Sequence, residues 1–379
     1  MEKTWRWFGP NDPITLEMLR QIGVEGIVTA LHSVPLGQVW SREAIREMRE
    51  FIESRGLRWS VVESLPVTET IKYGGPDRDL QIEIYKESLR NLGKEGVRTV
   101  CYNFMPILDW ARTDLEYPNP DGTSNLYFNN AEFAYFDINI LQREGARNDY
   151  PVDVINRMEA MGRLTPEKEQ QLIENIIIKT QGFVSGNFSE ADLLKLYEGI
   201  DKEHLRANMK YFLEAIMPVC DEYGINMCVH PDDPPKPVLG LPRIVTCDEE
   251  IRWLLDAVPD RHNGLTFCAG SLSAGIHNDV CLLAEKYAGR THFAHFRICQ
   301  VMPDGDFKES SHLDPRLIEV IRTFSRLNPD VPMRVDHAPL MLGDEKMGYN
   351  AGYSFHGRML ALGMISGIMA TIDTENQKS

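Results

Sequence analysis

Apolar and polar residues follow two alternating patterns along the chain. Short runs rich in β-branched and aromatic residues lie at 4–8, 26–32, 59–63, 99–104, 226–230, 265–269, 292–297 and 333–337. Between them, apolar residues recur at spacings of three and four, as at 45–52 and 317–324, which is typical of amphipathic helices. Alternation of strands and helices predicts parallel βαβ units. Eight units predict an α/β fold, a closed (β/α)8 TIM barrel, with an open doubly wound sheet as the alternative.

The stretch between the fourth and fifth predicted strands, residues 108–201, interrupts this alternation. It begins with the polar sequence YPNPDGTSNLYFNN and continues with helical patterns at 151–161 and 166–177. We therefore expect a single barrel domain over residues 1–379. The inserted segment 108–201 would lie on the catalytic face, as a lid or as a dimer contact.

Charge and composition exclude several classes of partner. The net charge of −16 argues against nucleic acid and anionic membranes, because both repel an acidic protein. The N-terminal sequence has no apolar stretch of a secretory signal, and no uninterrupted apolar run reaches the ~18 residues of a membrane span. Seven scattered cysteines without a CxxC pair indicate reduced thiols in a cytoplasmic protein.

Four consecutive predicted strands end in a residue type that binds metals. They are His230, Cys268, His295 and Asp336, each about one βα unit after the last. Alone, each has an ordinary structural interpretation: a core histidine, a small buried thiol, or a helix-capping aspartate. Because the carboxyl ends of barrel strands meet on one face, the four together predict a metal site. Two imidazoles, a carboxylate and a thiolate suit Zn²⁺, Fe²⁺, Mn²⁺ or Co²⁺.

In the stretch NMCVHPDDPP, we expect Cys228 to lie in the core and His230 to lie at the metal site. Cys228 lies two residues before His230, so it is ~6.6 Å lower along the strand and belongs to the packed interior. Asp232 and Asp233 lie in the following loop, where they support ligands, line the pocket or cap a helix. His337 follows Asp336 directly and therefore points differently. It is a candidate general base, with a purely supporting hydrogen bond as the alternative.

The motifs WRWFGPNDPITLEMLRQI, CYNFMPILDWARTDL, VHPDDPP, FCAGSLS, HFR and VDHAP resemble the mannonate dehydratase family over essentially the whole length. The resemblance implies a xylose-isomerase-like barrel that uses one Mn²⁺ or Fe²⁺ per subunit. It implies conversion of D-mannonate into 2-keto-3-deoxy-D-gluconate and water by a homodimer or higher homo-oligomer. The family's metal ligands match His230, Cys268, His295 and Asp336.

The same resemblance assigns an acid/base pair to His337 and Tyr353. Tyr349 is the alternative tyrosine, and Tyr353 is preferred because it precedes an apolar helix and Arg358, as in the family pattern. A sugar-acid substrate also needs a cation for its carboxylate. The candidates for contacting the substrate are Arg297, Arg358 and Arg112 for the carboxylate, and Asp109 and Trp110 for the sugar hydroxyls.

Three other functions fit parts of the pattern. A metal-dependent sugar isomerase on the same barrel is the main alternative, although such enzymes present several carboxylates, often to two ions. A sugar-acid-binding regulatory protein would need the pocket without an acid/base pair. A zinc-dependent endonuclease is disfavoured by the negative charge and by the lack of a basic, aromatic stripe.

Overall fold

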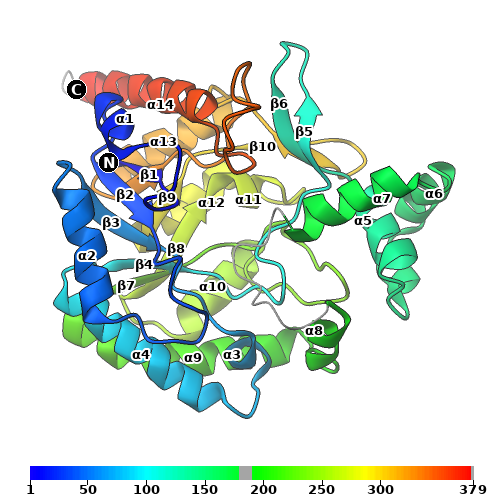
Figure 1. Cartoon of the computed structure of the whole chain (residues 1–379), viewed down its shortest axis with the longest axis horizontal. Helices are drawn as coiled ribbons and strands as arrows, with labels where there is room; N and C mark the ends of the chain where they lie inside the picture. Colours follow the sequence, from blue (N-terminus) through cyan, green and yellow to red (C-terminus); the bar gives the residue numbers. More distant parts are fainter. Residues whose placement is uncertain (179–189, 377–379) are drawn as a thin grey trace.

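Eight parallel strands close into a barrel in the computed structural model, which describes residues 1–178 and 190–376 (Figure 1). Around the barrel the order is β1-β12-β9-β8-β7-β4-β3-β2. The strands are β1 (Glu2–Arg6), β2 (Gly26–Thr29), β3 (Arg58–Glu63), β4 (Thr99–Tyr102), β7 (Asn226–Val229), β8 (Asn263–Cys268), β9 (Thr291–His295) and β12 (Pro332–Arg334). Each overlaps one predicted run, and closure confirms the TIM barrel over the open sheet.

Strand register aligns the carboxyl ends that carry the candidate ligands. Cys268 on β8 pairs with His295 on β9, which in turn pairs with Arg334 on β12. His230 directly follows β7, and Asp336 lies two residues beyond β12. The last strand is therefore shorter than predicted, and Asp336 belongs to the loop at the barrel mouth.

Amphipathic helices cover the outside of the barrel (Figure 1). The predicted patterns at 45–52 and 317–324 lie in α2 (Arg42–Glu53) and α13 (Pro315–Leu327), and both predictions are confirmed. Ser41 and Asp314 cap these two helices by accepting hydrogen bonds from backbone N–H groups of the first turn. The other helices of the layer are α1 (Leu16–Gln21), α3 (Glu69–Tyr73), α4 (Arg78–Lys94), α9 (Lys202–Tyr223), α10 (Asp248–Ala257), α11 (Ala269–Ser273), α12 (Val280–Tyr287), η4 (Ala288–Arg290) and α14 (Phe355–Asn376).

A small apolar layer fills the barrel interior beneath the mouth. Its members are Val28, Val61, Cys101, Cys228 and Phe293, all almost fully buried. Cys228 is thus core, as its position two residues before His230 predicted. This layer forms a floor under the residues at the strand ends.

The segment between β4 and α9 forms secondary structure of its own, projecting to one side of the barrel (Figure 1). The helical patterns at 151–161 and 166–177 are confirmed as α6 (Val152–Ala160) and α7 (Pro166–Ile173), which continues into η3 (Glu174–Ile178). The remaining elements are α5 (Asn130–Tyr135), η1 (Phe136–Ile140), η2 (Ala146–Asp149) and α8 (Glu190–Leu196). They surround a second apolar cluster that includes Phe133, Phe136 and Met158.

The polar start of this segment, for which the sequence predicted no strand, forms a hairpin. Its strands are β5 (Asp114–Pro118) and β6 (Ser124–Phe128), joined by a turn in which Gly122 has φ 86°. β6 also pairs with β11 (Phe307–Glu309), which pairs with β10 (Cys299–Val301). This four-stranded sheet, here called the small sheet, has the order β10-β11-β6-β5 and joins the loops after β4 and β9.

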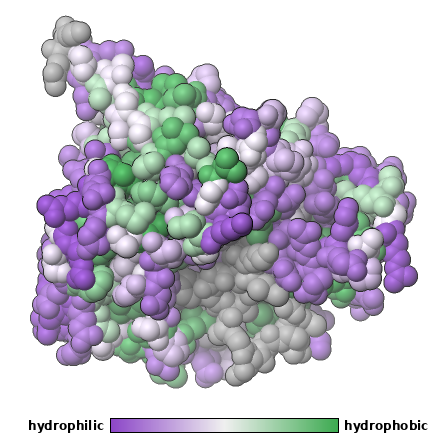
Figure 2. Space-filling view, turned by 45° about the horizontal axis from the view of Figure 1, so that its top comes forward, coloured by the Kyte–Doolittle hydropathy of each residue, from purple (hydrophilic) through white to green (hydrophobic). Residues whose placement is uncertain are grey.

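The last helix, α14, is long and apolar enough to cross a membrane by length and composition alone. The expectation that no uninterrupted apolar run reaches ~18 residues holds for this helix too, because glycines and polar residues interrupt it. About 39% of its most apolar stretch is buried in the protein, where it packs against α13. Apolar side chains gather on the surface where α14 lies (Figure 2), among them Met359 and Leu360.

Candidate metal centre and catalytic cavity

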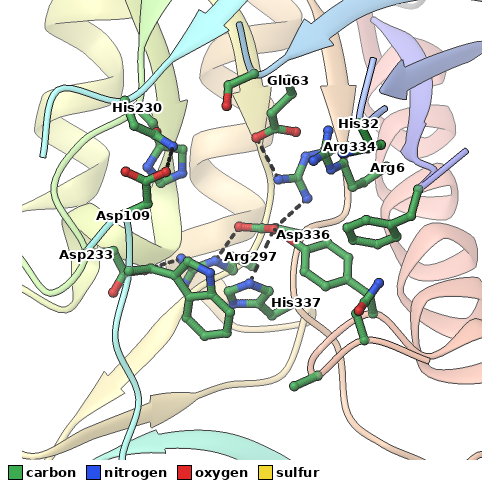
Figure 3. A pocket seen from close by; sticks show the side chains of 17 residues that line it. Arg6, His32, Glu63, Asp109, His230, Asp233, Arg297, Arg334, Asp336 and His337 are labelled. Carbon is green, nitrogen blue, oxygen red and sulfur yellow. Dashed lines mark hydrogen bonds and ion pairs between the residues drawn. The ribbon is translucent and has the colours of Figure 1, made fainter. Parts of the chain in front are cut away.

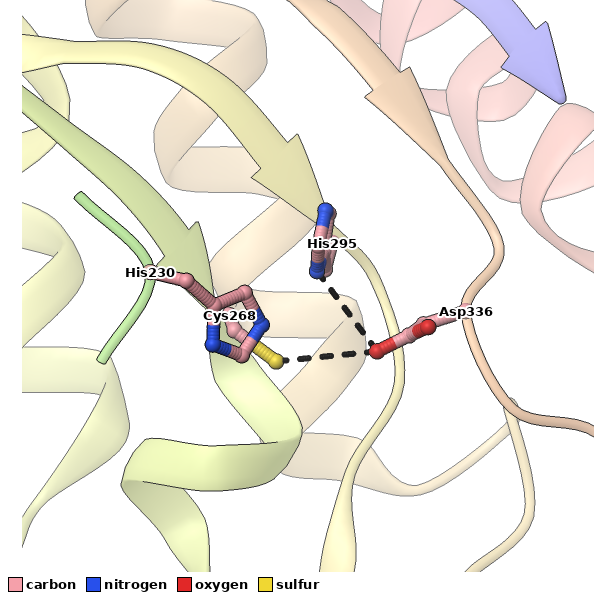
Figure 4. A group of neighbouring side chains, drawn as sticks. All are labelled: His230, Cys268, His295 and Asp336. Atoms are coloured by element: carbon pink, nitrogen blue, oxygen red, sulfur yellow. Dashed lines mark hydrogen bonds and ion pairs between the residues drawn. The ribbon is translucent and has the colours of Figure 1, made fainter. Parts of the chain in front are cut away.

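His230, Cys268, His295 and Asp336 converge at the mouth of the barrel (Figure 4). One potential ligand atom from each lies within 4.8 Å of those of the other three. Cys268, His295 and Asp336 are buried, and His230 is partly buried. Strand-end spacing alone thus selected four side chains that the fold brings to one point.

The hydrogen bonds of the two histidines leave one ring nitrogen of each for an ion. His230 Nδ1 lies 2.7 Å from the carbonyl oxygen of Pro231, so it donates there and Nε2 keeps its lone pair. His295 Nδ1 is buried without a hydrogen-bond partner and lies 3.5 Å from Asp336 Oδ2. On its other side, His295 Nε2 accepts from Arg334 Nε at 3.1 Å and lies 3.3 Å from Glu63 Oε1. A carboxylate behind a ligating imidazole is a frequent support in metal sites.

The thiol and the carboxyl group of this centre are held in the forms that bind metals. Burial alone would raise the pKa of Cys268, but the charges of Arg297 and His230 lower it well below its usual value. Burial likewise opposes ionisation of Asp336, and Arg334, His337 and Arg297 lower its pKa well below the ordinary range. A thiolate, a carboxylate and two imidazoles are ligand types that fit a borderline divalent ion such as Mn²⁺, Fe²⁺, Zn²⁺ or Co²⁺.

A cavity of about 300 Å³ opens beside this centre (Figure 3). We call it the catalytic cavity. Its lining includes three cations, four carboxylates and several aromatic or imidazole rings from the mouths of most barrel strands. It is formed by Arg6, Phe8, His32, Glu63, Ser64, Asn103, Asp109, Trp110, His230, Asp233, Arg297, Arg334, Asp336, His337, Asn350, Ala351 and Tyr353.

His337 is fixed in this cavity from two sides. Its Nδ1 lies 3.1 Å from Glu309 Oε1 on the small sheet, and its Nε2 lies 3.7 Å from Asp336 Oδ1. The indole of Trp110 packs against the imidazole, with ring centres 5.1 Å apart. With Nδ1–H donated to Glu309, the lone pair is on Nε2, at the Asp336 side of the ring.

Tyr353 meets the same group of residues from the loop before α14. Its hydroxyl donates to Asp336 Oδ1 at 3.1 Å, and its ring contacts His337 edge-on at 5.2 Å between centres. Burial, together with Asp336, raises the pKa of Tyr353 well above its usual value, so the hydroxyl stays protonated at neutral pH. Tyr349 does not line the catalytic cavity and instead borders a separate hollow.

The three arginines predicted to contact substrate occupy different positions. Arg297 lines the catalytic cavity, but its donors contact Asp233 (2.7 Å), Asp336 (2.7 Å) and Glu309 (3.1 Å). Arg112 lies outside the cavity lining and is also paired to Asp233 and Glu309.

Arg358 lies outside the lining as well, against the Trp5 ring. It donates to the backbone carbonyls of Arg6 and Tyr353 at 2.9 and 2.8 Å. Asp109 and Trp110, the other two predicted substrate contacts, both line the cavity.

Sequence reasoning missed four charged residues at the site: Arg6, Glu63, Arg334 and Glu309. Arg6, Glu63 and Arg334 are the last residues of β1, β3 and β12, so extending the strand-end rule beyond metal-ligand types would have found them. Arg334 bridges Glu63 Oε1 (3.0 Å) and Asp336 Oδ1 (2.5 Å). Glu309 belongs to a three-residue strand outside the barrel, and no local pattern marks it.

Fold and site together define a class: TIM-barrel enzymes with a metal-binding group at the carboxyl ends of the strands. The D-allulose 3-epimerase of Methylomonas sp. shares the fold alone, with a TM-score of 0.52, 10% identity and 98% of each chain covered. The model of the family D-mannonate dehydratase (UxuA) matches residues 1–379. The chain therefore belongs to the mannonate dehydratase family, and it is a hydro-lyase.

Individual relatives agree with this assignment. The mannonate dehydratase of Chromohalobacter salexigens is 42% identical over 98% of this chain and 99% of its own. That of Marinomonas sp. is 42% identical over 97% and 98%. The crystal structure of the mannonate dehydratase from Streptococcus suis serotype 2 superposes with a TM-score of 0.80 at 33% identity, covering 99% of this chain and 96% of its own.

Proposed function

We propose that the enzyme converts D-mannonate into 2-keto-3-deoxy-D-gluconate and water. The supporting observation is that the candidate metal group and a base/acid pair meet on one carboxylate. Asp336 Oδ1 accepts from Tyr353 at 3.1 Å and lies 3.7 Å from His337 Nε2. Dehydration of a sugar acid needs these functions together, because a weakly acidic C–H proton leaves one carbon and hydroxide leaves the next.

In this proposal His337 is the base and Tyr353 the acid. His337 Nε2 takes the proton from C2, the C3–O bond breaks, and Tyr353 protonates the departing oxygen to give water. The resulting enol then gains a proton at C3, loses the proton of its C2 hydroxyl and becomes the 2-keto acid. Glu309 holds His337 Nδ1 and so keeps Nε2 free for the C2 proton.

His230, Cys268, His295 and Asp336 would hold one ion per subunit, Mn²⁺ or Fe²⁺. When bound, such an ion supplies Lewis-acid stabilisation of negative charge on substrate oxygens. Asp109 and Trp110, which line the cavity, would contact the sugar hydroxyls. Arg297, Arg112 and Arg358 support the site by fixing carboxylates and backbone carbonyls around it.

Paired variants test the acid/base assignment. We expect His337→Asn and Tyr353→Phe, each loaded with Mn²⁺, to lose at least ~100-fold in the rate of 2-keto acid release from D-mannonate, as removal of a general acid or base does. Tyr349→Phe is the matched control and should stay near the parent rate. Metal content, measured by mass spectrometry, should match the parent in all three. Substantial turnover by His337→Asn would exclude His337 as the base.

We also propose that the enzyme is a cytoplasmic homodimer or higher homo-oligomer. All seven cysteines are free, which fits a reducing compartment. The exposed apolar side chains of α14, with Met359 37% and Leu360 48% exposed, favour a subunit contact there, and the inserted segment 108–201 is the second candidate, as a dimer contact or a lid. Light scattering of the parent and of Leu360→Glu distinguishes them, since only a contact through α14 would be weakened by this charge.

A further inference from the structure

Arg6 is the cation of the catalytic cavity that forms no ion pair with a carboxylate in residues 1–178 and 190–376, although the charge of Glu63 acts on it from a longer distance and raises its pKa. It is the last residue of β1, is 8% exposed and lines the cavity (Figure 3). Its Nη1 atom is buried without a hydrogen-bond partner. Within the described parts of the chain, no ion pair joins its guanidinium to Asp or Glu. A buried charge left in this state is costly, so an anion brought to it would be bound strongly.

The other two cations that line the cavity differ from Arg6 in this respect. Arg334 is paired to Glu63 and Asp336, and Arg297 is paired to Asp233, Glu309 and Asp336. Their charges are used within the protein, and moving either to a ligand would leave carboxylates unpaired. Within the described residues, Arg6 forms no such ion pair.

The neighbours of Arg6 leave its charge available. The Phe8 ring lies 5.1 Å from the guanidinium carbon, which contributes a weak cation–π contact but no hydrogen bond. Burial and the charge of Arg6 lower the pKa of His32, also in the cavity lining, to about 4, so its imidazole is neutral at pH 7. Burial likewise lowers the pKa of Arg6 itself, and the charge of Glu63 offsets only part of this effect.

The position of Arg6 suits the acid end of a sugar acid. β1 is the neighbour of β12 in the barrel, and the loop after β12 carries Asp336 and His337. Phe8 connects the two parts of the site, because its ring also contacts Tyr353 edge-on at 5.2 Å. In a substrate whose C2 and C3 lie between His337 and Tyr353, the carboxylate is attached directly to C2. Its binding partner must therefore lie close to these two residues.

We propose that Arg6 binds the substrate's carboxylate. The assignment rests on the proposed dehydration of D-mannonate and names the residue that recognises its acid group. A guanidinium presents two parallel N–H donors to a carboxylate, which fixes its plane as well as its position. The same contact stabilises the negative charge that spreads onto the carboxylate as the C2 proton leaves.

The test compares a carboxylate with its neutral amide. D-mannonate and D-mannonamide are titrated calorimetrically into Mn²⁺-loaded His337→Asn enzyme, in which binding is measured without turnover. In this background we expect mannonate to bind more tightly than the amide by about 10- to 100-fold, the range of a charge-assisted hydrogen-bond pair. Adding Arg6→Gln should reduce this preference to about twofold, and Arg6→Lys should restore part of it. Arg58→Gln, which changes an exposed arginine of β3, is the matched control and should keep the full preference.

Each outcome decides the proposal. A merely structural role for Arg6 would weaken both ligands equally and leave the preference intact, and this result would overturn the assignment. A preference that persists in Arg6→Gln would place the carboxylate on the metal or on another cation and would also overturn it. Failure of the proposed function is seen separately, as the absence of 2-keto acid release by the parent enzyme on D-mannonate.

Discussion

Glu309→Gln tests how the small sheet supports His337. Glu309 is 3% exposed and accepts from two arginines and an imidazole: Arg297 Nη1 at 3.1 and 3.2 Å, Arg112 Nη2 at 3.3 Å and His337 Nδ1 at 3.1 Å. Glutamine keeps the shape and one acceptor oxygen but removes the negative charge. Loss of this negative charge therefore affects Arg297, Arg112 and His337 to different degrees.

Both arginines keep a second carboxylate, since Asp233 lies 2.6 Å from Arg112 and 2.7 Å from Arg297. Breaking a buried ion pair usually costs 3–5 kcal/mol, so we expect a smaller loss of about 2–3 kcal/mol in the free energy of unfolding. For a chain of this size, that lowers Tm by about 2.5–4 °C. His337 retains one carboxylate within 4 Å, Asp336, which lies 3.7 Å from its other nitrogen.

The larger effect should therefore be on turnover. Changing a residue that orients a functional imidazole typically costs 10–100-fold, and we expect kcat to fall in this range with little change in KM or metal content. Steady-state release of 2-keto acid and metal analysis measure these quantities. Glu116→Gln, an exposed change on strand β5 of the same sheet, should leave all of them unchanged. An unchanged kcat in Glu309→Gln, or a loss explained by missing metal, would refute the role given to Glu309.

Two further predictions concern the metal centre and acid stability. Cys268→Ser should weaken Mn²⁺ binding, measured by competition with a chelator, by more than ~100-fold, beyond the loss typical of a merely supporting residue. Cys228→Ser, in the layer below, should keep metal affinity and instead lower Tm by a few degrees, because it buries a hydroxyl; equal metal affinities would contradict the ligand set. Although burial alone would raise the pKa of Glu309, Arg297 and His337 lower it to about 2 from its ordinary 4.5, so its stabilisation is complete above pH ~4.5 and is lost as the pH falls toward 2. Urea unfolding between pH 6 and 3, after removal of metal by a chelator, should show the free energy of unfolding falling with pH. The fall should be smaller in Glu309→Gln, and an equal fall in both proteins would contradict the prediction.

The barrel could be predicted because its signal is local and repeated. Each βα unit buries its own strand and one helix face, so its apolar spacing is visible within about forty residues. The same regularity placed His230, Cys268, His295 and Asp336 at one mouth, since parallel strands share a direction. Cys228 was correctly assigned to the core by the two-residue period of a strand.

The rest of the site depends on pairings between distant segments. The hairpin β5–β6 was missed because its strands are short and polar, and they are stabilised by pairing with β11, about 180 residues later in the chain. Glu309 could not be found without that pairing. The lack of an ion pair at Arg6 among the described residues likewise depends on what surrounds it, and the sequence WRWFGP does not reveal which arginines have carboxylate partners.

The small sheet also limits how this enzyme can be redesigned. β6 comes from the loop after β4 and β11 from the loop after β9, and they are joined by the Phe128–Phe307 stack at 5.2 Å and by Asn125 donating to the Glu309 carbonyl at 3.0 Å. Loops of a TIM barrel are often exchanged one at a time, as independent modules. Here an exchange of either loop alone would displace Glu309 and with it His337. The two loops would therefore have to be transplanted together, and in evolution we expect their sequences to change together.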